Sequence, residues 1–187
     1  MTKATLFWVD LEMTGLVPGV DKILEVAAIG TDWELNEICR YEGVVKVDEA
    51  LMKERMVGPF WEANAESRDG LMAQNAEGKA VGEIERELIE FLDANFAKES
   101  ILDARGKGKI ILAGNSVHQD KKFIEVEMPK LNERLHYRIL DVSAWKVYFE
   151  GAKLAPRFLK REAHRALDDI RGSIEELGYY RKFLKGE

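Results

Sequence analysis

Three apolar segments lie within the first 47 residues, before any segment with helical spacing, and this order constrains the fold most. Residues 4–10 and 22–31 are short apolar runs that predict buried strands, and residues 37–47 predict a third strand with weaker alternation. A sheet that begins in this way must bury its apolar faces against other elements. The remaining sequence is therefore expected to supply helices that cover it.

The later segments alternate between helix and strand. Residues 48–76 are polar and predict short helices and loops, whereas residues 79–96 carry apolar side chains at helical spacing. The remaining predicted elements are a strand at 110–113, a helix at 116–128 that ends before Pro129, a strand at 137–142 and a helix at 163–183. This order predicts an α/β fold with a mixed five-stranded sheet flanked by helices.

The size and composition of the chain indicate one globular domain. A chain of 187 residues can bury one sizeable core, so we expect a single domain spanning residues 1–187. The apolar runs are too short to cross a membrane, and the first residues lack the features of a signal peptide. The single cysteine, Cys39, permits no internal disulfide. We therefore expect a cytoplasmic protein.

The balance of charge limits the kinds of nucleic acid that the chain could bind. Its formal net charge is −6, which disfavours a protein that holds long nucleic acid through many phosphate contacts. A short substrate remains compatible with this charge if bound metal ions supply the positive charge.

Two acidic residues, Asp10 and Glu12, stand two apart at the end of the first predicted strand. Alternate residues of a strand share a face, so both carboxylates are expected on the same side of the sheet. Two such charges repel each other unless a cation lies between them, and a divalent metal prefers oxygen ligands of this kind. Two solvated acids at an exposed strand end would also explain the pair.

A third acid, Asp120, falls in the first turn of the helix that follows the fourth predicted strand. Ser116 and Gln119 have the S-x-x-Q spacing of a capping box, which predicts that the helix starts at Val117. Asp120 then shares an inward stripe with Val117 and Ile124, where a carboxylate needs a partner. An acid attracted to the helix dipole is the alternative interpretation.

Two adjacent acids, Asp168 and Asp169, occur in the last predicted helix. At 100° per residue, Asp169 lies at the edge of the apolar stripe and Asp168 faces solvent. The stripe comprises Ala163, Ala166, Leu167, Ile170, Ile174 and Leu177. Asp169 is therefore the better candidate metal ligand. His164 precedes it by five residues, where a loop could bring it to a substrate, although a plain surface histidine also fits this position.

The order of these residues along the chain is more specific than any one of them. Asp and Glu on the first strand, Asp on a mid-chain helix, and His and Asp five apart near the C-terminus match the layout of the DEDDh exonucleases. Four longer motifs closely resemble the oligoribonuclease family, and the resemblance covers nearly the whole chain. They are DLEMTGL at residues 10–16, LAGNSVHQD at 112–120, YRILDVS at 137–143 and HRALDDI at 164–170.

This resemblance implies an RNase H-like fold of the DnaQ exonuclease type. It also implies a homodimeric 3′→5′ exoribonuclease that hydrolyses short oligoribonucleotides, especially 5′-phosphorylated dinucleotides, to nucleoside 5′-monophosphates. By resemblance, Asp10, Glu12, Asp120 and Asp169 hold two Mg²⁺ or Mn²⁺ ions, and His164 activates the attacking water. Two metal ions can lower the pKa of water and stabilise the leaving oxygen, and histidine can accept a proton near neutral pH.

The resemblance further implies which residues contact the substrate. Leu16 matches a residue that wedges between two bases, and Trp61 matches an aromatic residue of the pocket. Stacking on an aromatic ring tolerates any base, although Trp61 also fits a partly buried loop anchor. Asn115 and Ser116 match residues that contact the nucleotide backbone.

A second group of residues matches the segment that reaches the substrate from the other subunit of the family's dimer. Tyr137, Arg138 and Ser143 would cap the far phosphate of a dinucleotide. A guanidinium suits bidentate binding of phosphate, but Arg138 could equally be a solvated charge beside a strand. Such a cap would favour dinucleotides over longer chains.

Other polar residues have less definite roles. His118 is expected at the surface, His136 has no obvious partner before the fifth strand, and Asp141 is expected to be structural. A basic cluster near His164 could attract phosphate or only solvate a loop. The cluster consists of Arg157, Lys160, Arg161 and Arg165.

Two other functions compete with this interpretation. One is a DEDDh exonuclease that proofreads or repairs single-stranded DNA, and comparing DNA with RNA as substrate separates the two. The other is a catalytically silent RNA-binding scaffold, which metal-dependent turnover would exclude.

Overall fold

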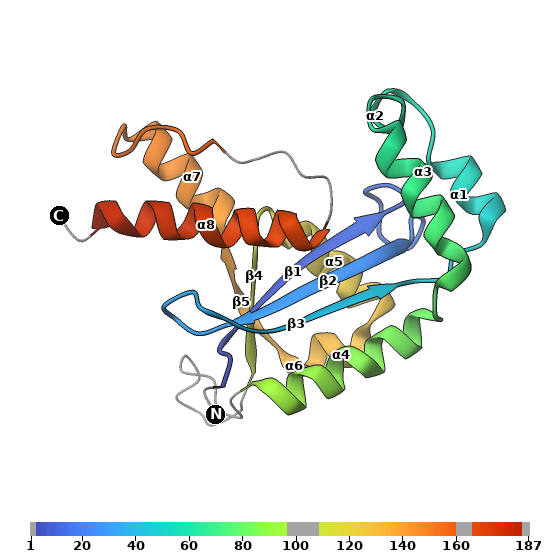
Figure 1. Ribbon diagram of the computed structural model, residues 1–187, viewed down its shortest axis with the longest axis horizontal. Coiled ribbons are helices and arrows are strands. Elements are labelled where there is room, and N and C mark those ends of the chain that lie inside the picture. Colours follow the sequence, from blue (N-terminus) through green and yellow to red (C-terminus); the bar gives the residue numbers. More distant parts are fainter. Residues whose placement is uncertain (1–2, 97–108, 160–165, 185–187) are drawn as a thin grey trace.

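The computed structural model describes residues 3–96, 109–159 and 166–184. A five-stranded sheet in the order β3-β2-β1-β4-β5 forms its centre (Figure 1). The strands are β1 (Leu6–Met13), β2 (Ile23–Thr31), β3 (Glu37–Val44), β4 (Ile110–Gly114) and β5 (Leu135–Asp141). The first three strands pair in antiparallel fashion, and β4 and β5 join β1 in parallel. The predicted mixed sheet is confirmed.

Helices cover both faces of the sheet. They are α1 (Glu49–Arg55), α2 (Pro59–Ala63), α3 (Ala65–Gln74), the 3-10 helix η1 (Asn75–Glu77), α4 (Val81–Asn95), α5 (His118–Glu127), α6 (Pro129–Arg134), α7 (Val142–Gly151) and α8 (Ala166–Leu184). Figure 1 shows α7 and α8 on one face and α4 and α6 on the other. Within the described residues, no helix is both long and apolar enough to cross a membrane.

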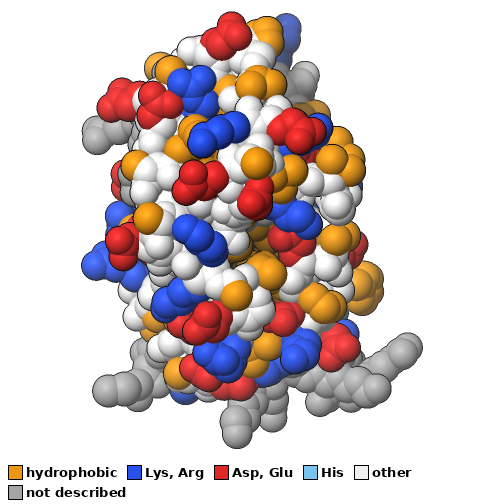
Figure 2. Space-filling view, turned by 90° about the vertical axis from the view of Figure 1, so that its right-hand side faces the viewer, with side chains coloured by type: hydrophobic (Ala, Val, Ile, Leu, Met, Phe, Trp, Pro, Cys, Tyr) orange, Lys and Arg blue, Asp and Glu red, His pale blue; other side chains and the backbone are white. Residues whose placement is uncertain are grey.

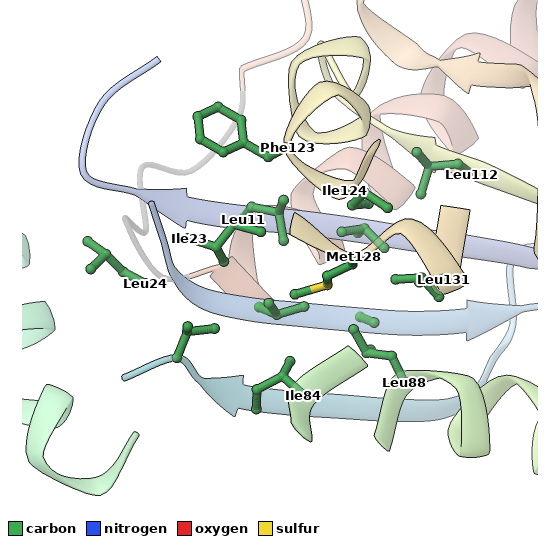
Figure 3. Packing of buried hydrophobic residues seen from close by; sticks show 14 of the residues in the cluster. Leu11, Ile23, Leu24, Ile84, Leu88, Leu112, Phe123, Ile124, Met128 and Leu131 are labelled. Atoms are coloured by element: carbon green, nitrogen blue, oxygen red, sulfur yellow. The ribbon is translucent and has the colours of Figure 1, made fainter. Parts of the chain in front are cut away.

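Alternate side chains of β1 separate the core into two clusters. Phe7 and Val9 pack on the face covered by α4, α5 and α6, whereas Leu6 and Trp8 pack on the face covered by α7 and α8. Figure 3 shows Ile84 and Leu88 of α4 packed with the strands in the first cluster. Complete burial of one such aliphatic side chain contributes about 1.5–3 kcal/mol. Because β2 is central and covered on both faces, all nine of its residues are buried.

Several element boundaries differ from those predicted. Strand β1 continues to Met13, so Asp10 and Glu12 lie within it, where β2 pairs with them. The short helix α6 is not predicted from the sequence, where Pro129 indicates only the end of the preceding helix. In the structure it stands in the first turn of α6, where its missing amide hydrogen is no disadvantage.

The segment around β5 also differs from the prediction. This strand begins at Leu135, so His136 lies within it and is buried, and its Nδ1 accepts a hydrogen bond from the amide of Arg138 at 3.0 Å. The unpredicted helix α7 follows directly, because Asp141 caps it by accepting a hydrogen bond from the amide of Ser143 at 2.9 Å. The structural role expected for Asp141 is thus observed.

Candidate active site

The end of β1 carries two of the candidate ligands at a free edge of the sheet. Strand β2 pairs with β1 as far as its last residue, but β4 pairs with it only as far as Trp8. The second half of β1, which includes Asp10 and Glu12, therefore extends beyond β4. Both carboxylates are half-buried and lie on the face that α8 covers.

Helix α8 brings a third carboxylate to this pair. One carboxylate oxygen from each of Asp10, Glu12 and Asp169 lies within 4.8 Å of the other two. The neighbouring Asp168 is exposed and pairs with Arg171 at 3.5 Å. The predicted placement is observed, with Asp169 partly buried beside the other two acids and Asp168 in solvent. Three carboxylates this close are a donor set that fits a hard divalent cation.

Asp120 approaches β1 from α5 and is almost completely buried. Its Oδ1 accepts a hydrogen bond from the amide of Leu11 at 3.0 Å, in the part of β1 that β4 does not pair with. Burial raises the pKa of Asp120 well above its usual value, and the negative charge of Asp10 adds to this shift. The Leu11 amide opposes the shift. A cation between Asp10 and Asp120 would favour the ionised form.

The predicted capping box at the start of α5 is wrong. The helix begins at His118 with Val117 as its cap residue, and no side chain caps it. Ser116 adopts a φ of 50°, and its hydroxyl lies 3.0 Å from the Ser143 hydroxyl. Gln119 instead donates from Nε2 to the carbonyl of Leu16 at 2.7 Å. Both side chains bind neighbouring segments instead of the helix end.

The two apolar residues expected at the substrate differ in exposure. Leu16 is 70% exposed on the loop that follows β1, so it can contact a ligand. Trp61 is only 6% exposed, and its indole Nε1 donates to the carbonyl of Thr14 at 3.3 Å. This matches the loop-anchor alternative. The exposed aromatic on α2 is Phe60, which lies edge-on to Trp61 and was not identified from the sequence.

Asn115 takes part in a polar network within the chain. Its Nδ2 donates to Glu176 Oε2 at 2.9 Å and to Ser173 Oγ at 3.2 Å, and its Oδ1 accepts from Ser143 Oγ. Glu176 is buried on α8 and also accepts from Tyr180. Glu176 was not identified from the sequence, although it lies at helical spacing from the apolar stripe of the last predicted helix.

The remaining candidates lie at the surface or outside the described residues. Tyr137 is 72% exposed, and the guanidinium of Arg138 stands 5.1 Å from the centre of its ring. Arg157 is exposed and pairs with Glu150. His118 is exposed as expected, with Nδ1 3.3 Å from Asp141 Oδ2. The positions outside the described residues are His164, Lys160, Arg161 and Arg165.

A buried carboxylate, Asp21, holds the loop between β1 and β2. It accepts two hydrogen bonds from Arg55 of α1, at 2.8 and 3.2 Å. Burial alone would raise the pKa of Asp21, but the hydrogen bonds from Arg55, the Val17 amide and Thr14 lower it overall below its ordinary value of 3.8.

This shift predicts how acid affects the protein. Because the pKa of Asp21 is lower in the folded state, its contribution to stability is present above about pH 4 and is lost as the pH falls through the folded-state pKa. Arg55→Met should therefore lower the melting temperature most near neutral pH, and the difference from the unmodified protein should shrink below pH 4. Thermal unfolding at several pH values measures this. A difference that is constant with pH would contradict it.

Comparison with known proteins agrees with this geometry. The exonuclease family RNase_T matches residues 7–177. The oligoribonuclease of Aliivibrio fischeri is 40% identical over 182 residues, which cover 96% of this chain and 94% of that protein. The oligoribonuclease of Neisseria meningitidis serogroup A is 37% identical over 187 residues, covering 96% and 92%. The chain belongs to the oligoribonuclease family. The resemblance carried by the four motifs is thereby confirmed.

Solved structures show the same fold in more distant proteins. Exonuclease I from Methylocaldum szegediense matches with a TM-score of 0.65 at 17% identity, over 96% of this chain and 40% of that protein. A 3′-exonuclease that recognises a histone mRNA stem-loop matches with a TM-score of 0.62 at 15% identity, over 98% and 65%. This member of the oligoribonuclease family therefore has the RNase H-like fold of DEDDh exonucleases.

Proposed function

We propose that the chain is a 3′→5′ exoribonuclease that hydrolyses short oligoribonucleotides, especially 5′-phosphorylated dinucleotides, to nucleoside 5′-monophosphates. The observation that carries the proposal is the convergence of Asp10, Glu12 and Asp169 within 4.8 Å in a chain of the oligoribonuclease family. We assign this activity to residues 1–187 acting as one exonuclease domain. The single cysteine is in keeping with a cytoplasmic location.

Four carboxylates would hold two divalent ions, Mg²⁺ or Mn²⁺, and His164 would accept the proton of the attacking water. Asp10, Glu12 and Asp169 supply ligands from one side, and Asp120 supplies another from α5. When bound, the ions neutralise the carboxylates and the phosphodiester and make water more acidic. The Leu11 amide orients the carboxylate of Asp120, and burial excludes water from it.

The surface beside the site suits a short substrate. Among the described residues, Figure 2 shows positive and negative side chains interspersed on the face that carries α1, without a continuous basic stripe. Long nucleic acid is usually held by such a stripe. The exposed side chain of Leu16 would separate two bases, and Trp61 would fix the backbone of the nearby loop through Thr14. Asn115 and Ser116 would contact the nucleotide backbone.

A homodimer would complete the substrate site. Strand β5 is the last strand of the sheet, and an edge strand offers unpaired backbone groups to a partner. Tyr137 on this strand is exposed, as are Val147 and Tyr148 on α7, so apolar surface is available for a second copy. In that arrangement Tyr137, Arg138 and Ser143 would reach the far phosphate of a dinucleotide bound to the other subunit.

The length of the preferred substrate tests the proposal. Product analysis with 5′-phosphorylated RNAs of two to ten residues should show the dinucleotide cleaved at least about tenfold faster than the ten-mer, which corresponds to about 1.4 kcal/mol of discrimination. Cleavage should stop in chelator and return with Mg²⁺ or Mn²⁺. DNA of the same lengths is the control. Equal rates at all lengths would contradict the capped site, and a preference for DNA would support a proofreading or repair exonuclease.

A further inference from the structure

The loop between β1 and β2 is short, and its backbone is fixed by hydrogen bonds. The amides of Val20 and Asp21 both donate to the carbonyl of Val17, at 3.1 and 2.8 Å, and the amide of Thr14 donates to the carbonyl of Lys22 at 2.9 Å. These bonds close a tight loop that carries Leu16 outward at 70% exposure. The apolar tip is thus exposed on a fixed backbone.

The side chain of Asp21 lies at the centre of this loop and is only 1% exposed. Its Oδ1 accepts from the Thr14 hydroxyl at 3.2 Å and from Arg55 Nε at 2.8 Å, and its Oδ2 accepts from the Val17 amide at 2.9 Å and from Arg55 Nη2 at 3.2 Å. A single carboxylate therefore ties both sides of the loop to α1. The bidentate geometry gives this pair directional specificity.

Two further contacts fix the loop, and the second of them reaches the helix that carries Asp120. Gly15 packs against Asp21 so closely that a Cβ at this position would lie 2.6–2.7 Å from the carboxyl atoms. The carbonyl of Leu16 accepts a hydrogen bond from Gln119, which directly precedes Asp120 on α5. Leu16 is therefore linked to α1 through Asp21 and to the metal-binding region through Gln119.

We infer that Asp21 and Arg55 are positioning residues that fix Leu16 over the site and so, together with the proposed phosphate cap, strengthen the preference for dinucleotides. The inference rests on the proposed function, because it assumes that Leu16 contacts the bases. A dinucleotide has only two bases and one far phosphate to contact, so its binding depends more than that of a ten-mer on a wedge held at a constant distance from the reacting phosphate. If the Asp21–Arg55 ion pair is broken, the residues of the loop are unchanged, but the loop loses its contact with α1.

The test compares Arg55→Met with Arg55→Lys and with Arg86→Met, an exposed arginine of α4 that serves as the matched control. Each variant is assayed with a 5′-phosphorylated diribonucleotide and a 5′-phosphorylated ten-mer in Mg²⁺. Arg55→Met should raise KM for the dinucleotide about tenfold with kcat changed less than about threefold, because uniform binding is lost. The dinucleotide-to-ten-mer ratio of kcat/KM should fall about tenfold, by the same reasoning.

Arg55→Lys should restore part of this ratio, and Arg86→Met should leave it unchanged. Gln119→Leu provides a second test of the loop, because it removes the hydrogen bond to the Leu16 carbonyl. It should also lower the dinucleotide-to-ten-mer ratio of kcat/KM. Equal losses of kcat/KM on both substrates would show that Arg55 is merely structural and would overturn the inference. Should Arg55→Met fail to fold, an unchanged ratio in Gln119→Leu would likewise overturn it.

Hydrogen exchange separates failure of this inference from failure of the proposed function. Amides of residues 14–21 should exchange faster in Arg55→Met than in Arg86→Met, whether or not RNA is cleaved. If the unmodified protein cleaves neither RNA, the proposed function fails, and exchange alone decides whether Asp21 and Arg55 hold the loop. If the unmodified protein prefers the dinucleotide and Arg55→Met keeps that preference, only the inference fails.

Discussion

Asp169→Asn is expected to lower metal-dependent cleavage of a 5′-phosphorylated diribonucleotide at least about 1,000-fold, because a lost metal contact removes several kcal/mol of transition-state stabilisation at about 1.4 kcal/mol per tenfold. The asparagine has nearly the same shape, so the half-buried position should still pack. The change removes one of the three carboxylates that converge within 4.8 Å. Initial rates at saturating Mg²⁺ and Mn²⁺ provide the measurement.

Asp168→Asn is the matched control, since it makes the same chemical change one residue away. Asp168 is exposed and contacts Arg171 of its own helix. Its loss should change the rate less than about twofold, since exposed ion pairs contribute only about 0–1 kcal/mol. Comparable losses in the two variants would show that the helix end matters as a whole, and would remove the support for a metal site that includes Asp169. Asp10→Ala should behave like Asp169→Asn while the protein remains folded.

The strands and the positions of the acidic residues could be predicted because their signals are local. The largely apolar segment at residues 22–31 predicts a buried strand, and all nine residues of β2 are buried. The step of 100° per residue separates Asp169 from Asp168 without any tertiary information. Likewise, the spacing of Asp120 from Val117 and Ile124 predicts the burial that is observed.

The partners of polar side chains could not be predicted, because they depend on segments distant in sequence. Ser116 and Gln119 match a capping box, yet they bind Ser143 and Leu16, which lie on other segments. The burial of Trp61 depends on how α2 packs beside the end of β1. Asp21 and Arg55 form no local motif, since 34 residues separate them.

For Asp120, the burial follows from local spacing, whereas the partners depend on segments distant in sequence. Its inward stripe was predicted, but the hydrogen bond from Leu11 and the proximity of Asp10 required the folded chain. The same surroundings suggest a conflict between stability and function. A buried carboxylate beside other negative charges destabilises the metal-free fold, although the proposed metal site would need that charge.

Asp120→Asn should therefore stabilise the metal-free protein and abolish its activity. Because the pKa of Asp120 is raised in the folded state, the folded protein loses stability as the pH rises from the unfolded value of 3.8 towards the folded-state pKa. Each pKa unit corresponds to about 1.4 kcal/mol, and each kcal/mol to about 2–4 °C in a chain of this size. Asparagine avoids this loss, and its side-chain oxygen can still accept the hydrogen bond from Leu11.

Thermal unfolding at pH 5 and pH 8, in chelator and in Mn²⁺, measures these effects. In chelator, Asp120→Asn should melt above the unmodified protein at pH 8, with a smaller difference at pH 5, where the carboxyl binds a proton more readily. Mn²⁺ should raise the melting temperature of the unmodified protein much more than that of the variant, because binding to the folded state alone stabilises it. Asp168→Asn should show neither effect. If Asp120→Asn melted lower in chelator at pH 8, or gained as much from Mn²⁺ as the unmodified protein, Asp120 would be a structural carboxylate and the metal site would consist of the other three acids.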